Sequence, residues 1–227
     1  MTTIAVRLQG VQDRIARAAQ AAGRAVDEVA LIAVTKTVAA DRIAEAYRCG
    51  QRAFGENYVQ ESLAKIAALH DLPLEWHYIG PIQSNKTRAI AEHFQWVHSI
   101  DRVKIAERLA ASRSADQPPL NVCIQINVSG ESTKGGVPPG DELSIAQAIA
   151  ALPRLRLRGL MTIPEPTDDV SLQRRRYAEV RKARDGLVAA GYAVDTLSMG
   201  MSDDLEAAIA EGATIVRVGT AIFGARK

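Results

Sequence analysis

Short apolar runs alternate with stretches of helical periodicity along the whole chain, and this alternation restricts the possible folds more than any other feature. Helical spacing follows each of eight apolar runs, which begin near residues 29, 53, 75, 96, 121, 156, 196 and 215. The runs at 29–34 and 122–126 are apolar on both faces, as strands are when helices cover one side of a parallel sheet and a core fills the other. The pattern predicts eight parallel strands with helices between them.

The chain length favours closure of these strands into a barrel. A (β/α)8 barrel typically has about 250 residues, and this chain has 227. The alternative is an open, doubly wound sheet, but no G-x-G-x-x-G motif follows the first strand, where a dinucleotide-binding sheet would carry it. No linker or low-complexity tract divides the chain. We therefore expect residues 1–227 to form a single TIM-barrel domain of the α/β class.

An extra helix is expected before the first strand, over residues 2–22, and Gly23 should end it. Apolar residues at helical spacing form one face of this segment: Ile4, Leu8, Val11, Ile15 and Ala18. A stripe of this kind is typical of an amphipathic helix.

The composition argues against several functional classes. The chain has 28 basic and 26 acidic residues, a net charge of +2, so there is no excess of cations for nucleic acid or an anionic membrane. The longest apolar run, 29–34, has six residues, whereas a membrane span needs about 18 or more. Residues 1–10 lack the layout of a signal peptide. Cys49 and Cys123 show no metal-ligand spacing. We expect a cytoplasmic protein without a metal, and a monomer, because no further apolar stripe is evident.

Functional groups of a TIM barrel gather at the carboxyl ends of its strands, and Lys36 follows the first strand. The alternation from Ile32 and Val34 directs its side chain into the barrel rather than toward the helices. Burial favours the neutral amine, which can form a Schiff base with a carbonyl compound. The alternative is a lysine that extends from the barrel rim to water.

Two segments with glycine form a candidate phosphate site. Residues 198–202 (SMGMS) end the seventh strand, and Gly219 and Thr220 end the eighth. These are the loops that commonly bind phosphate in TIM barrels, where small residues let backbone N–H groups approach an anion. The alternative is that the glycines serve only tight turns and the last serine of the first segment caps a helix. Asp203 and Asp204 would repel a phosphate, so we expect both to point away.

Arg217 lies two residues before Gly219 and shares its inward direction. A buried guanidinium must be paired, so Arg217 either forms an ion pair with Glu56 or faces a polar ring of a cofactor. His77 is interpreted as a satisfied core histidine, because no nucleophile lies near it in the sequence. A lysine for an aldehyde, loops for a phosphate and an arginine between them suggest pyridoxal 5′-phosphate as the ligand.

Six separated motifs extend from the first strand to the last residues. They are 33–37 (AVTKT), 54–61 (FGENYVQE), 77–86 (HYIGPIQSNK), 158–161 (RGLM), 198–204 (SMGMSDD) and 217–224 (RVGTAIFG). Together, and in this order, they resemble the pyridoxal phosphate homeostasis proteins. That family is similar in fold to the N-terminal barrel of bacterial alanine racemase, a fold-type III architecture for binding this cofactor.

The resemblance implies a set of cofactor-binding residues: Lys36, Asn57, Met161, Ser198, Met201, Ser202, Arg217, Gly219 and Thr220. Lys36 would carry the cofactor as a Schiff base, and Arg217 would lie near the pyridine nitrogen. The phosphate would lie at Ser202, Gly219 and Thr220. The resemblance does not decide whether Lys134, in the loop 129–140, reaches the cofactor.

An arginine at the pyridine nitrogen disfavours its protonation and weakens the ring as an electron sink. Racemisation also needs a second acid–base group, which alanine-racemase-like enzymes draw from a further β-domain, and only residues 221–227 follow the eighth strand. We therefore expect a non-catalytic protein that buffers or delivers pyridoxal phosphate in vitamin B6 homeostasis, with pyridoxal-phosphate-dependent apo-enzymes as candidate recipients.

Two enzymatic alternatives stay open. One is a small racemase or decarboxylase that recruits its second base from a neighbouring subunit, from Tyr58 or from His77. The other is a Schiff-base aldolase that acts on a phosphorylated sugar and carries no cofactor.

Overall fold

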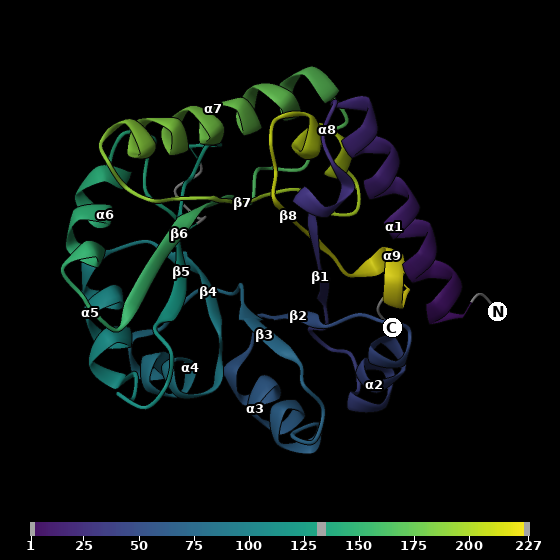
Figure 1. The fold of residues 1–227 in the computed structure, drawn as a ribbon, viewed down its shortest axis with the longest axis horizontal. Coiled ribbons are helices and arrows are strands. Elements are labelled where there is room, and N and C mark those ends of the chain that lie inside the picture. Colours follow the sequence, from purple (N-terminus) through teal and green to yellow (C-terminus); the bar gives the residue numbers. More distant parts are fainter. Residues whose placement is uncertain (1–2, 131–134, 225–227) are drawn as a thin grey trace.

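Eight parallel strands close into a barrel, as the alternating pattern predicted (Figure 1). The computed structural model describes residues 3–130 and 135–224. Each strand pairs with the next, and the first pairs with the last. The strands are β1 (Ala30–Val34), β2 (Ala53–Glu56), β3 (Glu75–Tyr78), β4 (Trp96–Ile100), β5 (Leu120–Gln125), β6 (Leu155–Met161), β7 (Thr196–Ser198) and β8 (Ile215–Val218).

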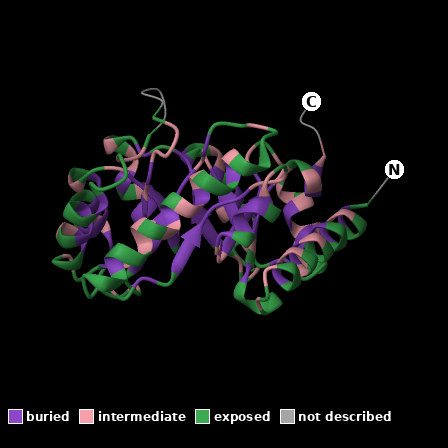
Figure 2. Cartoon of the chain, turned by 90° about the horizontal axis from the view of Figure 1, so that it is seen from above, coloured by how far each residue is buried: buried purple, intermediate pink, exposed green. Residues whose placement is uncertain are grey.

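Helices form the outer layer and alternate with the strands (Figure 1). They are α1 (Ile4–Ala21), α2 (Ala40–Arg48), α3 (Val59–Ala68), α4 (Thr87–His93), α5 (Val103–Ser112), α6 (Glu142–Ala150), α7 (Val170–Ala189), α8 (Leu205–Ala210) and α9 (Thr220–Phe223). Two short 3-10 helices, η1 (Val26–Glu28) and η2 (Ser84–Lys86), precede β1 and α4. Figure 2 shows the consequence: the strands are buried, and the outer faces of the helices are exposed.

The predicted N-terminal helix is present as α1, with bounds close to the expected 2–22. Thr3 caps it by accepting a hydrogen bond from the Val6 amide. The predicted stripe is buried, except that Ala19 rather than Ala18 completes it. This face packs against α8 and α9, beside the last strand (Figure 1). These contacts make α1 part of the barrel's outer layer. Burial of each of its larger side chains stabilises this packing by about 1.5–3 kcal/mol.

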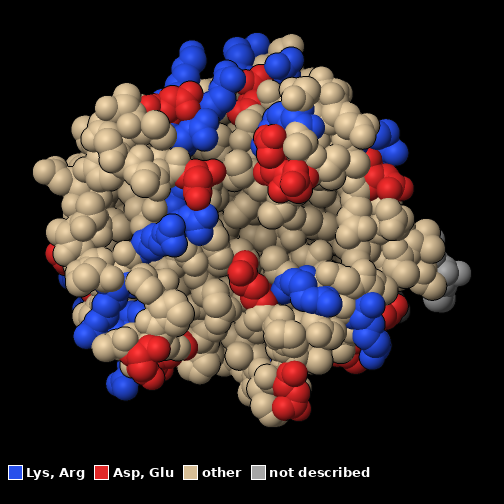
Figure 3. Space-filling model, in the orientation of Figure 1, with Lys and Arg blue, Asp and Glu red and all other residues tan. Residues whose placement is uncertain are grey.

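Charged side chains are distributed without a dominant sign. On the face seen in Figure 3, acidic and basic side chains are interspersed, in keeping with the net charge of +2. Among the described residues, no helix combines the length and the apolar character that crossing a bilayer requires.

Gly159 allows β6 to approach β7 closely. The register of β5 against β6 shifts between Val122 and Cys123, at the point where Cys123 comes to lie opposite Gly159. A Cβ atom on Gly159 would lie 1.9 Å from the carbonyl oxygen of Thr196 on β7. No side chain fits at that distance, so the barrel needs glycine at this position.

The variant Gly159→Ala should therefore be strongly destabilised. Its methyl group would push β6 away from β7, and overpacking of this kind costs about 1–3 kcal/mol or more. Urea denaturation followed by circular dichroism measures the change. The matched control is Gly186→Ala in α7, where an added Cβ meets nothing within 4 Å. That variant should gain about 0.5–1 kcal/mol. Equal midpoints for Gly159→Ala and the wild type would contradict the steric argument.

Candidate functional site

A cavity of about 230 Å³ opens where the carboxyl ends of several strands meet. Its wall consists of Val34, Lys36, Asn57, Ile79, Ile163, Met201, Ser202, Asp203, Arg217, Gly219 and Thr220. All the predicted cofactor-binding residues except Met161 and Ser198 belong to this wall. Barrel closure brings them together, because β1 and β8 are neighbours with Ile32 opposite Arg217.

Lys36 lies in the turn that follows β1 and is partly buried. It lines the cavity together with Val34, two residues before it, as the strand alternation predicted. Its neighbour Thr35 is buried and contacts Glu56 instead. Lys36 therefore presents an amine to the cavity, while Thr35 belongs to the layer between the barrel and α3.

Asn57 follows β2 and contributes a polar amide to the cavity wall. Its backbone carbonyl accepts a hydrogen bond of 3.1 Å from Tyr78 Oη. Burial raises the pKa of Tyr78 to about 12, so the hydroxyl keeps its proton at neutral pH. Gly80 also permits this arrangement, since a Cβ there would lie 2.3 Å from the Asn57 carbonyl oxygen. The side-chain Oδ1 of Asn57 is buried and has no partner among the described residues, so it is an acceptor for a ligand donor.

Both predicted phosphate segments reach the cavity. Ser202, Gly219 and Thr220 line it. A Cβ on Gly200 (φ +95°) would lie 2.6 Å from the Ala208 Cβ, and one on Gly219 would lie 3.1 Å from the Val34 carbonyl oxygen. The glycines thus allow close packing of both loops. The alternative that the serine of this segment caps the next helix is wrong, because α8 begins at Leu205, after Asp204.

The two aspartates of the 198–204 segment differ in direction. Asp204 points away from the cavity: it accepts hydrogen bonds from the Met201 amide (2.6 Å) and from Tyr177 Oη (2.7 Å). Asp203, however, belongs to the cavity wall, so the expectation that both turn away is wrong for this residue. Asp203 lies in the turn before α8 rather than in its first turn. The argument from the helix dipole therefore does not apply to it.

Arg217 is buried, and it lines the cavity as predicted. Its NH1 donates to the carbonyl oxygen of Ser198 at 2.5 Å and to Ser198 Oγ at 2.8 Å, and NH2 donates to the Thr162 carbonyl at 2.8 Å. The alternative ion pair with Glu56 is wrong. The Glu56 carboxylate faces α3 and pairs with Lys65, on the other side of the barrel wall.

A chain of hydrogen bonds continues from Arg217 through the barrel. Ser198 Oγ lies 2.8 Å from His98 Nδ1, and His98 Nε2 lies 3.0 Å from His77 Nδ1. His77 Nε2 lies 2.6 Å from Glu75 Oε1. Both rings are buried. Donation from Ser198 to His98, from His98 to His77 and from His77 to Glu75 satisfies every pair if both histidines are neutral with the proton on Nε2.

The interpretation of His77 as a satisfied core histidine is thus confirmed, since both ring nitrogens have partners. Burial lowers the pKa of His77, although Glu75 acts in the opposite direction. The pKa of His98 is lowered further, by burial and by the neighbouring His77 and Arg217. The chain keeps Ser198 and Arg217 in one orientation.

Met161 and Ser198 lie behind the cavity wall rather than in it. Met161 is fully buried in a small cluster with Trp96 and Cys123, against which the wall residue Ile163 packs. Ser198 supports Arg217 from beneath. Both are the last residues of their strands, so they lie deeper in the barrel than the loops that follow and that line the cavity. Lys134 lies outside the described residues.

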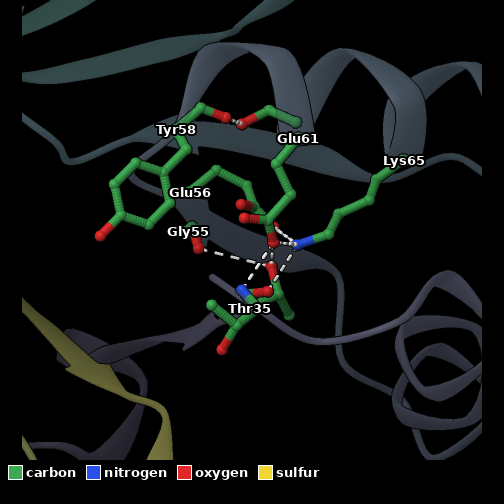
Figure 4. Close-up of polar contacts among 8 residues, drawn as sticks. Thr35, Gly55, Glu56, Tyr58, Glu61 and Lys65 are labelled. Carbon is green, nitrogen blue, oxygen red and sulfur yellow. Dashed lines mark hydrogen bonds and ion pairs between the residues drawn. The ribbon is translucent and has the colours of Figure 1, made fainter.

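One polar cluster next to the site escaped the sequence analysis. Glu56, Glu61 and Lys65 meet between the barrel and α3, directly behind the turn that carries Lys36 (Figure 4). Glu61 and Lys65 have the i, i+4 spacing of a helix ion pair, which could have been noticed. Nothing in the spacing distinguishes a buried pair from an exposed one.

The wall offers chemically distinct groups to one small ligand. Lys36 supplies an amine, Arg217 a fixed cation, Asn57 an unsatisfied acceptor, and the two glycine-containing loops supply room for backbone contacts. Among the described residues, no cluster of histidine, cysteine, aspartate and glutamate side chains could hold a metal ion. The arrangement suits an aldehyde that carries an anionic group and a polar ring.

Known proteins that are similar to this chain are named for an aldehyde of this kind. Residues 6–227 match the family described as alanine racemase, N-terminal domain. A pyridoxal phosphate homeostasis protein of Pseudomonas aeruginosa is 60% identical over 226 residues, which cover 100% of this chain and 97% of that protein. The pyridoxal phosphate homeostasis protein of Escherichia coli is 53% identical over 229 residues, covering 100% of this chain and 98% of that protein.

Solved structures show the same fold. PipY of Synechococcus elongatus, in a structure with PLP bound, has a TM-score of 0.85 and 38% identity, and the match covers 98% of this chain and 100% of that one. Alanine racemase from Corynebacterium glutamicum has a TM-score of 0.68 and 21% identity, covering 95% of this chain and 62% of that one. The second match is a likeness of fold alone.

The buried histidines predict a loss of stability in mild acid. The pKa of each is lowered from 6.5 in the folded chain, so below pH 6.5 the unfolded chain binds more protons than the folded one. The free energy of unfolding should then decrease as the pH falls, by up to about 1.4 kcal/mol per pH unit for each histidine. Urea denaturation between pH 7.5 and pH 5 measures the slope.

His98→Gln should flatten this slope, because it removes the group with the larger shift. The matched control is His93→Gln, which removes an exposed histidine of α4 outside the hydrogen-bond chain. A wild-type slope in His98→Gln would contradict the assignment of a neutral buried ring.

Proposed function

Because the chain belongs to the alanine racemase N-terminal domain family, and within it to the pyridoxal phosphate homeostasis proteins, we propose that it binds pyridoxal 5′-phosphate in this cavity and serves vitamin B6 homeostasis. The observation that carries the proposal is the meeting of Lys36, Arg217 and the two glycine-containing loops in one wall. The relatives are named for this compound, and PipY was solved with PLP bound.

Lys36 is the residue proposed to hold the ligand covalently. When bound, pyridoxal phosphate supplies an aldehyde, with which the Lys36 amine forms a C=N bond as one water molecule leaves. The position of Lys36 in the cavity wall supports this role.

The opposite end of the cavity is proposed to hold the phosphate. Ser202 and Thr220 offer hydroxyl groups there, and Gly219 lets the backbone come close to the ligand. Met201 contributes an apolar surface to the same wall. Asn57 Oδ1, which has no partner among the described residues, would accept a hydrogen bond from a ring substituent.

Arg217 is proposed to lie beside the pyridine nitrogen. Its guanidinium is held by two carbonyl oxygens and by Ser198 Oγ, so it is a rigid donor and cation. A fixed positive charge disfavours protonation of the nitrogen, and an unprotonated pyridine stabilises a carbanion poorly. The arrangement favours binding over turnover, and we propose a carrier without catalytic activity.

Neither of the second bases named for the racemase or decarboxylase alternative, Tyr58 or His77, lines the cavity, and the carboxylate in the described wall is that of Asp203. Tyr58 has a relative exposure of 56% and does not belong to the wall, and both nitrogens of His77 are occupied. Exchange of the α-proton of amino acids into deuterated water tests this alternative. Exchange that disappears in Lys36→Ala would establish an enzyme. The aldolase alternative predicts a colourless purified protein instead of one with a visible absorbance band.

One hydrophobic cluster extends from Ile4 to Phe223, which supports a single cofactor-binding domain over residues 1–227. Pyridoxal-phosphate-dependent apo-enzymes are the proposed recipients of the ligand. The cytoplasmic location and the monomeric state stay predictions.

Lys36→Ala should abolish covalent attachment and leave weaker binding through the phosphate. Visible absorbance, borohydride reduction and mass spectrometry of the trapped protein measure attachment, and equilibrium dialysis measures the residual binding. Lys104→Ala, which removes an exposed lysine of α5, serves as the control. A borohydride-stable adduct on another lysine of Lys36→Ala would overturn the assignment.

Arg217→Met should weaken binding of pyridoxal phosphate and change the visible spectrum of the bound form. The matched control is Arg113→Met, since Arg113 is also buried and donates only to backbone carbonyls. Both variants lose hydrogen bonds worth about 1.5–3 kcal/mol each, so both should unfold at lower temperature. Only the first should alter spectrum and affinity. If Arg217→Met binds pyridoxal phosphate with the same affinity as Arg113→Met, Arg217 does not contact the ligand.

A further inference from the structure

The turn that carries Lys36 rests on a buried ion cluster of α3 (Figure 4). Lys65 Nζ donates to Glu61 Oε1 at 2.5 Å, to Glu56 Oε1 at 2.7 Å and to the backbone carbonyl of Thr35 at 2.6 Å. The side chains of Lys65 and Glu56 have relative exposures of 8% and 0%. Thr35 Oγ1 also donates to Glu56 Oε1 at 2.6 Å. Short contacts therefore fix Lys65 Nζ and Glu56 Oε1, while Glu56 Oε2 is buried and has no partner among the described residues.

Two of its contacts flank Lys36 directly. The Thr35 carbonyl that Lys65 holds belongs to the peptide group before Lys36. The Thr37 amide, in the peptide group after Lys36, donates to Glu61 Oε1 at 2.6 Å. The orientations of these two peptide groups define the backbone torsions of Lys36. One ion pair thus holds both sides of the residue.

The backbone of the turn needs such support. Thr37 has φ +63°, and it is the only residue other than glycine with a positive φ among the described residues. This left-handed conformation is unfavourable for a residue with a Cβ, and it persists where surrounding contacts enforce it. Glu61 provides that contact through the Thr37 amide.

We propose that the pair Glu61–Lys65, supported by Glu56, is a clamp that positions Lys36 for its bond with the ligand aldehyde. Glu61 and Lys65 are positioning residues that act through the backbone of Thr35 and Thr37. The inference rests on the proposed function of Lys36. A correctly placed amine reaches the aldehyde carbon without further ordering of the turn, and misplacement by about 1 Å costs up to about a hundredfold in rate.

The cluster also explains why Lys36, and not the neighbouring Lys65, is the lysine proposed to react. The Lys65 ammonium donates to three oxygen atoms, which uses its full donor capacity. Burial raises the pKa of Glu56, while the hydrogen bonds from Lys65 and Thr35 act in the opposite direction. Lys65 is therefore unavailable as a nucleophile, although it lies close behind Lys36.

The test compares Glu61→Ala and Lys65→Met with the wild type. The apo-proteins are mixed with pyridoxal phosphate, and borohydride trapping with mass spectrometry gives the rate of adduct formation at Lys36. We expect rates about ten- to a hundredfold lower in both variants. Binding of inorganic phosphate, measured by calorimetry, should remain within about twofold. Amide hydrogen exchange of Thr37 in the apo-protein should accelerate in Glu61→Ala, because the acceptor is lost.

The matched control is Glu211→Gln. Glu211 is another buried carboxylate, held by Arg174 and Arg181 before β8 begins, away from the cavity wall. The control should lose stability but keep the wild-type rate. An equal loss of rate in the control would show that the rate depends on the stability of the protein and not on the clamp, and would overturn the proposal. Wild-type rates in Glu61→Ala would also overturn it.

Failure of the clamp and failure of the proposed function give different results. If the wild type forms no adduct at Lys36, the proposed function fails. If the wild type forms the adduct and Glu61→Ala forms it equally fast, only the clamp fails. Should Lys65→Met not fold, Glu61→Ala decides the question, since the Glu61 side chain has a relative exposure of 30% and its loss leaves a smaller buried void.

Discussion

The pairing of β1 with β8 is the constraint on which the site depends. It places Ile32 opposite Arg217 and Ala33 opposite Val218, so the segments that follow both strands lie side by side. The amine of Lys36 comes from the start of the sequence, and the guanidinium of Arg217 and the second glycine-containing loop come from its end. Without closure of the sheet, these groups would stand at opposite edges of an open structure. The helix α1 supports the closure from outside, because it packs against α8 and α9 next to this seam.

The charges around the site are arranged in two buried systems that differ in composition. Arg217 is held by neutral oxygen acceptors and continues through Ser198 and His98 toward the amino-terminal side of the barrel. Lys65, by contrast, has carboxylate partners. A cation without a carboxylate partner keeps more of its field for a ligand. The first system therefore faces the cavity, and the second compensates its own charge behind the wall.

Features that depend on neighbouring residues could be predicted from the sequence, whereas contacts between distant segments could not. Strand alternation is a local rule, so the inward directions of Lys36 and Arg217 could be read from the sequence. The partner of Arg217 could not be read in this way. Glu56 also lies at the end of a strand, but its position in the alternation turns it toward α3 and Lys65. Met161 and Ser198 were predicted on the correct strands. In the structure, however, both lie deeper in the barrel than the residues that line the cavity. The burial of Lys65 depends on the packing of α3 against the barrel, which the i, i+4 spacing alone does not reveal.

The proposed carrier needs a bond that forms readily and also reverses, and a Schiff base on Lys36 would meet both needs. Hydrolysis of a C=N bond takes up one water molecule and regenerates the amine and the aldehyde, so covalent attachment is compatible with release. When the same bond is used for catalysis, a protonated ring draws electrons from the substrate more strongly than an unprotonated one. Here the group proposed to meet the ring is a rigid, buried arginine whose orientation a chain of neutral histidines maintains. In this proposal, the same interactions that would hold the ligand in place would also restrain the chemistry it could perform.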